Sequence, residues 1–342
     1  MASAAARFRS VFKSRAFVQF SLTHSSSSKA NLEESIRAAV EAKAYQKIPE
    51  LLNASRDSCR NPNPFTFLST FSENQRFSVV DEMLQSFISI RPRSQPRKAY
   101  SCLLSLTLES SDRLPLALAI VQRMLRSGCL PAPQTHLMLS KAWLDRRQRL
   151  QQPVWRILLE MNSIGYSPDC GTCNYLILSL CKIDHFVEAV EVMRGMGRAG
   201  CIPDLDSFGT LIGEMSEFRL VNEVVELVEE MVRVHLLNPR KETIVKAVDA
   251  MRANREVRRA VEMIEFLEKE GVSVGFEVYE STLEGFLEVR QFILAGKFVV
   301  MMTERGFIPY IRVRQRLFEG LVNIGEAEFA SVVRQRFAQL KS

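Results

Sequence analysis

A short motif returns along this chain with a period near 35 residues. Glycine is followed three residues later by proline at Gly128, Gly165, Gly200 and Gly306. The first two intervals between these glycines are 37 and 35 residues, and the last, 106 residues, corresponds to three periods. A period of this length is the signature of a repeat array, in which each unit packs on its neighbours instead of closing its own core. The period therefore constrains the fold more than any other feature.

Each period reads as two amphipathic helices. In residues 170–204, apolar side chains at helical spacing predict a first helix from about Asn174 to Lys182 and a second from about Val187 to Ala199. Gly200 then supplies a left-handed stop, and the proline that follows prevents continuation. A small or apolar residue stands eleven positions before each repeat glycine, and before His235 in the period without one, and suits a close helix crossing. This series is Ala117, Val154, Ala189, Val224, Ala260 and Ala295, continued by Ala330.

Helix pairs of this size cannot bury their apolar faces alone, so they must stack on one another. We therefore predict an all-α fold, a right-handed superhelical solenoid of stacked antiparallel helix pairs. Residues 62–342 would hold about eight repeats, the last one truncated, and residues 31–61 a degenerate N-terminal helix pair. The repeats are expected to begin near residues 62, 97, 133, 170, 205, 241, 276 and 311.

The first thirty residues carry five lysines and arginines and no acid, among many Ser, Ala and Phe. This composition predicts a transit peptide over residues 1–30, for the mitochondrion or alternatively the chloroplast, and the early arginines favour the mitochondrion. A basic tail without targeting function is the other interpretation. Because the segment carries five of the six net positive charges, the remaining chain is almost neutral. The net charge is therefore no evidence for nucleic-acid binding.

Charge is nevertheless uneven along the chain. Residues 76–156 contain thirteen Lys and Arg against five Asp and Glu, whereas residues 160–290 contain fourteen against twenty-four. A local excess of cations can neutralise phosphates of a nucleic acid. The basic block therefore predicts phosphate contacts, with these candidates: Arg97, Lys98, Lys141, Arg146, Arg147 and Arg149.

Residues 170–204, CGTCNYLILSLCKIDHFVEAVEVMRGMGRAGCIPD, resemble the pentatricopeptide repeat. The resemblance rests on Asn174, Leu176-Ile177, Leu180-Cys181-Lys182, Glu188-Ala189, Gly200 and Pro203-Asp204. It implies a protein that binds single-stranded organellar RNA, with one repeat for each base. It also implies that Asn174 and Asp204, the fifth and last residues of the repeat, contact the base edge and prefer uracil, and that Lys182 contacts phosphate. The corresponding pairs of the other repeats, such as Gly209 with Pro239 or Arg240, are not standard base-reading pairs.

Signals for catalysis or metal binding are weak. The Cys170-x-x-Cys173 spacing occurs in redox and zinc sites, but no second such pair exists, and Cys173 falls on a packing position of the repeat. None of the four histidines stands in a His-x-Glu motif, and no glycine-rich phosphate loop is present. The C-terminal residues read as another helix pair. We therefore expect no enzymatic activity, no cofactor, no metal and no small-molecule substrate.

The apolar runs are much shorter than the roughly 20 residues that cross a bilayer, so we expect no membrane insertion. The leading hypothesis is a non-catalytic RNA-binding protein of mitochondrial RNA metabolism, in processing, stabilisation or translation. The alternative is a structural or assembly scaffold that binds ribonucleoprotein or ribosomal proteins, with little sequence-specific contact to RNA.

Overall fold

The computed structural model describes residues 26–55 and 63–339, and every regular element in those ranges is helical. The all-α prediction is thus confirmed. Residues 1–25 of the predicted transit peptide lie outside the described residues. The chain divides into two compact units, residues 1–102 and 103–342. The division falls within one helix, α4 (Arg97–Thr107).

The first unit begins with a helix pair, α1 and α2, that packs together. A short 3₁₀ turn, η1, joins the pair and lies against α3. The centre of the first unit is apolar, since Ile36, Leu52 and Met83 are completely buried. The elements are α1 (Ser26–Glu41), η1 (Tyr45–Lys47), α2 (Ile48–Ala54), η2 (Thr66–Thr70), α3 (Glu73–Phe87) and the first half of α4.

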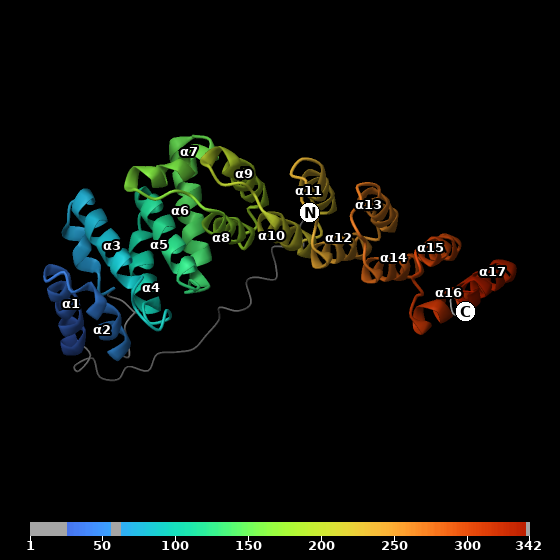
Figure 1. The fold of residues 1–342 in the computed structure, drawn as a ribbon, viewed down its shortest axis with the longest axis horizontal. Helices are drawn as coiled ribbons and strands as arrows, with labels where there is room; N and C mark the ends of the chain where they lie inside the picture. The colour runs from blue at the N-terminus through green and yellow to red at the C-terminus, as the bar shows by residue number, and fades with distance from the viewer. Residues whose placement is uncertain (1–25, 56–62, 340–342) are drawn as a thin grey trace, which may run out of the picture. The chain divides into compact units, whose positions relative to one another are not determined.

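The second unit contains the remaining helix pairs (Figure 1). Its elements after α4 are η3 (Ser111–Arg113), α5 (Leu114–Arg126), α6 (Gln134–Leu150), α7 (Val154–Leu159), η4 (Glu160–Ile164), α8 (Cys170–Cys181), α9 (Phe186–Met196), η5 (Gly197–Ala199), α10 (Leu205–Glu217), α11 (Val221–Arg233), α12 (Lys241–Ala253), α13 (Val257–Lys269), α14 (Phe276–Glu288), α15 (Phe292–Glu304), α16 (Ile311–Asn323) and α17 (Ala327–Gln339).

Two layers of helices run through this unit. The first helices of successive pairs, α6, α8, α10, α12, α14 and α16, each contact the next, and each packs on the second helix that follows it from α8 onward. Figure 1 shows α11, α13 and α15 as the second helices of successive pairs, beside α10, α12 and α14. This is the stacking predicted for a solenoid of antiparallel helix pairs. The helices α8, α10, α12, α14 and α16 begin at the first residues of five of the expected repeats.

The small residues of the repeat pattern lie in the core, as a close crossing of paired helices requires. Ala117, Ala189, Ala260 and Ala295 have no exposed surface at all. The larger members of the series are buried as well, since Val224 is completely covered. A bulkier side chain at these positions would push the paired helices apart.

The repeat glycines end the second helices in left-handed conformation. Gly200 has φ +88°, and the next residue, Cys201, donates its backbone N–H to the carbonyl of Met196 at 3.1 Å. This six-residue bond is the Schellman closure, which satisfies a carbonyl left over at the helix end. In the period where His235 stands at the glycine position, the positive φ of +53° falls one residue later, at Leu236, and Leu237 donates its backbone N–H to the carbonyl of Met231 at 3.0 Å. This helix therefore also ends in a left-handed residue, one position beyond the usual glycine.

The helix limits predicted for residues 170–204 were partly wrong. The first helix starts at Cys170 rather than Asn174, because Asp169 caps it and accepts the backbone N–H of Thr172 at 2.9 Å. The second α-helix ends at Met196, and its last turn to Ala199 is a 3₁₀ helix. The Cys-x-x-Cys stretch, expected in a loop entering the helix, consequently forms the first turn of α8.

Candidate nucleic-acid interface

The two residues expected to contact a base lie together. The side-chain amide of Asn174, on α8, donates to Oδ1 of Asp204 at 3.1 Å. Asp204 precedes α10 and belongs to the end of the same repeat. The hydrogen bond between them links α8 to α10, the first helices of two successive repeats, because Asn174 is on α8 and Asp204 caps α10. Both side chains are only partly buried, which leaves the pair open to a ligand.

Ser207 holds this pair in place. Its hydroxyl lies 2.6 Å from Oδ1 of Asn174 and 3.0 Å from Oδ1 of Asp204, and the side chain is completely buried. The backbone N–H of Asp204 donates to the same hydroxyl at 3.1 Å. Asp204 in turn accepts the backbone N–H groups of Asp206 and Ser207, which completes a capping box at the start of α10. The pair is therefore built on a helix cap.

The carboxyl of Asp204 is held in its ionised form. Partial burial opposes ionisation, but hydrogen bonds from the backbone N–H of Ser207 and from the amide of Asn174 outweigh it and lower the pKa of Asp204 below its ordinary value. An ionised oxygen at this point fixes the Asn174 amide, since only its NH₂ end can face the negative charge. The orientation of the amide is thus set by electrostatics as well as by packing.

One donor and one acceptor remain free on this pair. Every hydrogen bond of the Asp204 side chain to a described residue ends on Oδ1. Oδ2 can therefore accept, and the second N–H of Asn174 can donate. A uracil base offers an N–H beside carbonyl oxygens on its Watson–Crick edge, which complements this arrangement. The geometry thus suits the contact that the sequence predicts, and the base preference itself stays a prediction.

Lys182, the predicted phosphate ligand, is engaged within the protein. Its ammonium lies 2.8 and 2.9 Å from the two carboxylate oxygens of Glu214 on α10. This hydrogen bond to Glu214 raises the pKa of Lys182. A phosphate at Lys182 would have to compete with a carboxylate that is already in place, so the predicted role requires the pair to open.

Two arginines of the basic block bind carboxylates around α6. Arg146 contacts Asp112 and Glu160, both at 3.0 Å. Arg147 contacts Glu188 at 2.9 Å and also Glu191, both on α9. The two side chains are mostly buried, with 19% of Arg146 and 23% of Arg147 exposed. Arg146 and Arg147 therefore link α6 to neighbouring parts of the chain through ion pairs.

Lys141 and Arg149 line a shallow pocket of about 420 Å³ beside α6. Three carboxylates share this pocket with the two cations, namely Glu109, Asp112 and Asp145. Arg149 is paired with Asp112 at 3.0 Å. Acids in this number weaken the attraction for a phosphate, and only Lys141 is exposed without an ion pair to a described residue.

The remaining two candidates lie at the start of α4. Lys98 donates to the backbone carbonyls of Leu52 and Ser55 at 3.2 and 3.4 Å, at the end of α2, where a cation is favoured by the helix dipole. Arg97 is exposed at the first turn of α4. Within the second unit, Arg146, Arg147, Arg149 and Lys182 are thus each paired with a carboxylate, while their role as phosphate contacts stays a prediction.

The two cysteines of the Cys-x-x-Cys stretch make separate contacts within the protein. Cys173 is buried against Cys201, with 3.6 Å between the two sulfurs, while the thiol of Cys170 donates to the carbonyl of Ile202 at 3.2 Å. Among the described residues, no group of three or more His, Cys, Asp or Glu is arranged to hold a metal ion. Within the same residues, no helix is both long and apolar enough to cross a membrane.

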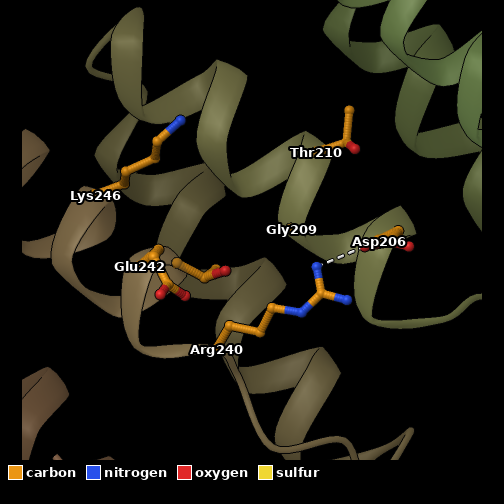
Figure 2. Close-up of a pocket in the computed structure, with 7 residues that line it drawn as sticks. Asp206, Gly209, Thr210, Arg240, Glu242 and Lys246 are labelled. Atoms are coloured by element: carbon orange, nitrogen blue, oxygen red, sulfur yellow. Dashed lines mark hydrogen bonds and ion pairs between the residues drawn. The ribbon is translucent and has the colours of Figure 1, made fainter.

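Sequence reasoning missed a pocket one repeat after the Asn174 site. It lies between α10 and α12, with Gly209 at its floor and Arg240 reaching toward Asp206 (Figure 2). The only signal in the sequence is spacing, because Gly209 follows Asn174 by one period of 35 residues. In the sequence, glycine at position 209 indicates a missing base contact, because it has no side chain. In the structure, the same lack of a side chain leaves space between α10 and α12.

The comparisons with known proteins agree with this architecture. A family model described as the PPR repeat matches residues 171–201. A pentatricopeptide repeat-containing protein of Arabidopsis thaliana is 52% identical over 311 residues, which cover 91% of this chain and 90% of that protein. The small ribosomal subunit protein mL103 (rPPR7) of the same plant is 26% identical over 138 residues, covering 40% of this chain and 32% of that protein.

Among solved structures, the pentatricopeptide repeat protein PPR10 from maize is similar over 91% of this chain, with 15% identity and a TM-score of 0.42. The matched part is 54% of the maize chain, so the present chain spans about half of that protein's length. At this TM-score the detailed geometry of the two proteins is not comparable.

Proposed function

Because the chain belongs to the pentatricopeptide repeat family, we propose that it is a non-catalytic protein that binds single-stranded RNA in an organelle. The observation that carries this proposal is the Asn174–Asp204 pair, which joins successive first helices and keeps one donor and one acceptor free. A base splayed out of a single strand can meet such a pair with its Watson–Crick edge. We assign uracil as the preferred base at this site.

Affinity and base preference have separate sources in this proposal. Phosphate contacts give affinity without sequence preference, whereas base-edge contacts give the preference. Arg146, Arg147 and Lys182 are already paired with carboxylates. Few RNA phosphates are therefore neutralised, few counterions are released from the RNA on binding, and the slope of log affinity against log salt should be small.

The test is equilibrium binding of the full chain to single-stranded RNAs of uniform composition over a range of salt concentrations. We expect measurable binding at low salt and tighter binding to uracil-rich RNA. Asn174→Ala should remove the uracil preference, at a cost in affinity of about tenfold, which corresponds to a lost base contact of ~1.4 kcal/mol. The control is Asn222→Ala, which changes an exposed amide on α11. Absence of RNA binding by the wild-type chain at low salt would overturn the proposal.

A second candidate function is a scaffold that holds proteins within an organellar ribonucleoprotein. It is favoured by the internal pairing of the cations described above and by the partial similarity to a ribosomal small-subunit protein. If the tagged protein keeps stoichiometric protein partners after ribonuclease treatment while Asn174→Ala leaves RNA binding unchanged, this second function replaces the first.

The organelle is part of the same proposal. We assign residues 1–30 as a mitochondrial transit peptide because of their basic, acid-free composition. Residues 1–30 fused to a fluorescent reporter should direct it to mitochondria. Accumulation of the reporter in chloroplasts, or its retention in the cytosol, would contradict that assignment.

A further inference from the structure

The connection between α3 and α4 is strongly basic. Residues 91–97, which we call the arginine loop, contain Arg91, Arg93 and Arg97. All three side chains are exposed. No aspartate or glutamate occurs anywhere in residues 83–108. Within the first unit, the loop is therefore a concentration of positive charge that no acid of the neighbouring sequence compensates.

Hydrogen bonds hold this loop in a defined conformation. Gln95 donates its backbone N–H to the carbonyl of Pro92 at 2.9 Å, which closes one turn. Arg97 donates its backbone N–H to the carbonyl of Ser94 at 3.2 Å, which closes a second. The side-chain amide of Asn53, on α2, donates to the carbonyl of Gln95 at 3.0 Å and ties the loop to the unit. The arginines are thus presented from a folded backbone, so little ordering of the loop is needed when a ligand binds.

Two of the three arginines have no carboxylate partner. Among the described residues, neither Arg91 nor Arg97 forms an ion pair. Arg91 uses Nη1 to donate to the backbone carbonyls of Ile88 and Ile90, at 2.8 and 2.9 Å, next to the end of α3. Its other two nitrogens form no hydrogen bond with a described residue. These arginines differ in this respect from Arg147, whose guanidinium is occupied by glutamates.

Arg97 gains no stability from its place in the fold. It lies in the first turn of α4, where the helix dipole favours acids and disfavours cations. Its side chain is exposed, and no ion pair with a described residue offsets this cost. A residue that breaks a local rule of helix stability without a compensating contact marks a functional position. The partner that would compensate Arg97 is an anion from outside the chain.

The chemistry of the loop suits phosphate groups. A guanidinium presents adjacent N–H groups that match two oxygens of one phosphate, and arginine stays ionised at any physiological pH. Attraction to phosphate does not depend on which base follows it. Contacts at this loop would therefore add affinity for RNA without adding base preference.

We propose that Arg91, Arg93 and Arg97 bind phosphates of the RNA backbone, separately from the base contact at Asn174 and Asp204. The inference rests on the proposed RNA binding and assigns a source of affinity that the paired cations of the second unit do not supply. Three phosphates neutralised on a single strand correspond to a slope of log affinity against log salt of about −2.

The test is equilibrium binding of the full chain to uracil-rich and adenine-rich single-stranded RNAs over a range of salt concentrations. The triple variant Arg91→Gln, Arg93→Gln, Arg97→Gln should lose affinity for both RNAs by the same factor. Its salt slope should be flatter by about 2, while its uracil preference should remain. The matching triple substitution to lysine should keep the slope, because counterion release depends on the charge.

The matched control changes three exposed cations outside the loop. Arg198→Gln, Arg258→Gln and Lys269→Gln together remove the same charge and should leave the slope unchanged. Circular dichroism should show the same melting temperature for both glutamine variants, since each substitution is at an exposed side chain.

The possible failures are distinct. RNA binding with an unchanged slope in the loop variant would overturn the phosphate site alone, and absence of RNA binding by wild type at low salt would overturn the proposed function with it. If polyglutamate bound wild type and not the loop variant, while RNA affinity stayed equal, the loop would serve an acidic protein and the proposal would be wrong.

Discussion

At the scale of single residues, Asp204 has two tasks. Its side chain caps α10 through two backbone N–H groups and also orients the amide of Asn174. The resemblance to the pentatricopeptide repeat predicts the pairing with Asn174, because it assigns both residues to one base contact. It does not predict the cap, which depends on α10 beginning directly after Asp204.

The two tasks of Asp204 can be separated by substitution. Asp204→Ala removes the cap and should lower the free energy of unfolding by about 1 kcal/mol, while Asp204→Asn, also a good cap, should change it by less than about 0.5 kcal/mol at neutral pH. Both should lose the uracil preference, because the acceptor Oδ2 is gone or neutralised. Thermal unfolding followed by circular dichroism, together with RNA binding, measures the two effects. A stable Asp204→Asn that still prefers uracil would contradict the assigned role of the charge.

The same residue gives stability a dependence on pH. Because the pKa of Asp204 is lower in the folded protein than its ordinary value, ionisation stabilises the fold above the unfolded pKa of about 4. That contribution is lost as the pH falls through the lower, folded value. Wild type should therefore lose stability relative to Asp204→Asn below about pH 4, and a constant difference between them across this range would argue against it.

The buried thiols should be inert. Cys173 is 1% exposed and Cys201 is 6% exposed, and the hydrogen bond between them and burial together raise the pKa of Cys173. Neither should react with an alkylating agent in the native protein, although both should react after unfolding. Mass spectrometry of labelled peptides checks this, and a chelator should leave the melting temperature unchanged. A fall in melting temperature on metal removal would revive the metal interpretation of Cys170-x-x-Cys173.

At the scale of helices and turns, the glycine that ends each second helix is where backbone conformation matters most. Gly200 has φ +88°, and Gly197, three residues earlier, has φ −56°. A methyl group would meet no heavy atom within 4 Å at either position. The two sites thus differ in backbone conformation and not in available space.

This pair allows a controlled experiment. Gly200→Ala should lower the free energy of unfolding by about 1 kcal/mol, because a left-handed conformation is unfavourable for a residue with a Cβ. Gly197→Ala should raise it by up to about 1 kcal/mol, since alanine is the better helix former. Chemical denaturation of both variants beside wild type gives the comparison. Equal effects of the two substitutions on the free energy of unfolding would mean that the left-handed conformation of Gly200 imposes no energetic penalty on alanine.

The elements themselves were largely predictable from the sequence, and their limits were not. The Gly-x-x-Pro motifs and the apolar spacing located the helix pairs, because both are local signals. The turns inside the pairs were harder to recognise. Asp184, Arg219, Arg255 and Arg290 have positive φ between the first and second helices of four repeats. Aspartate is a weak turn signal and the three arginines carry none, so mainly the fixed spacing of these sites marks them.

At the scale of the whole molecule, the cations of the basic block, residues 76–156, differ in what they contact. Arg147 connects α6 with two glutamates of α9, whereas Lys141 is exposed in a pocket that contains three acids. Composition alone gives both residues the same role. The glutamate partners of Arg147 are more than thirty positions away in the sequence. No local sequence pattern can therefore distinguish an arginine that links two repeats from an exposed lysine.

Substitution distinguishes these two roles. Arg147→Gln should lower the free energy of unfolding by about 2 kcal/mol, because it leaves Glu188 partly buried without its cation. Lys141→Gln should change it by less than about 0.5 kcal/mol. Denaturation curves and RNA affinity are measured on the same preparations. If Arg147→Gln proved as stable as wild type but bound RNA more weakly, Arg147 would be a phosphate contact after all.

The ion pairs between repeats have a consequence for how such an array can change. Arg194 meets Glu230 of the next repeat, Arg252 meets Glu284 and Glu288 of the next, and Lys182 meets Glu214. Lys182–Glu214 and Arg194–Glu230 lie at one junction, and Arg252 with Glu284 and Glu288 lies at another, so the set of pairs differs between the two junctions. A repeat moved elsewhere in the array would therefore leave its charges without partners. The ion pairs therefore depend on which repeat follows which, and these repeats are not interchangeable. Duplication or exchange of one repeat would require new ion pairs with both of its neighbours.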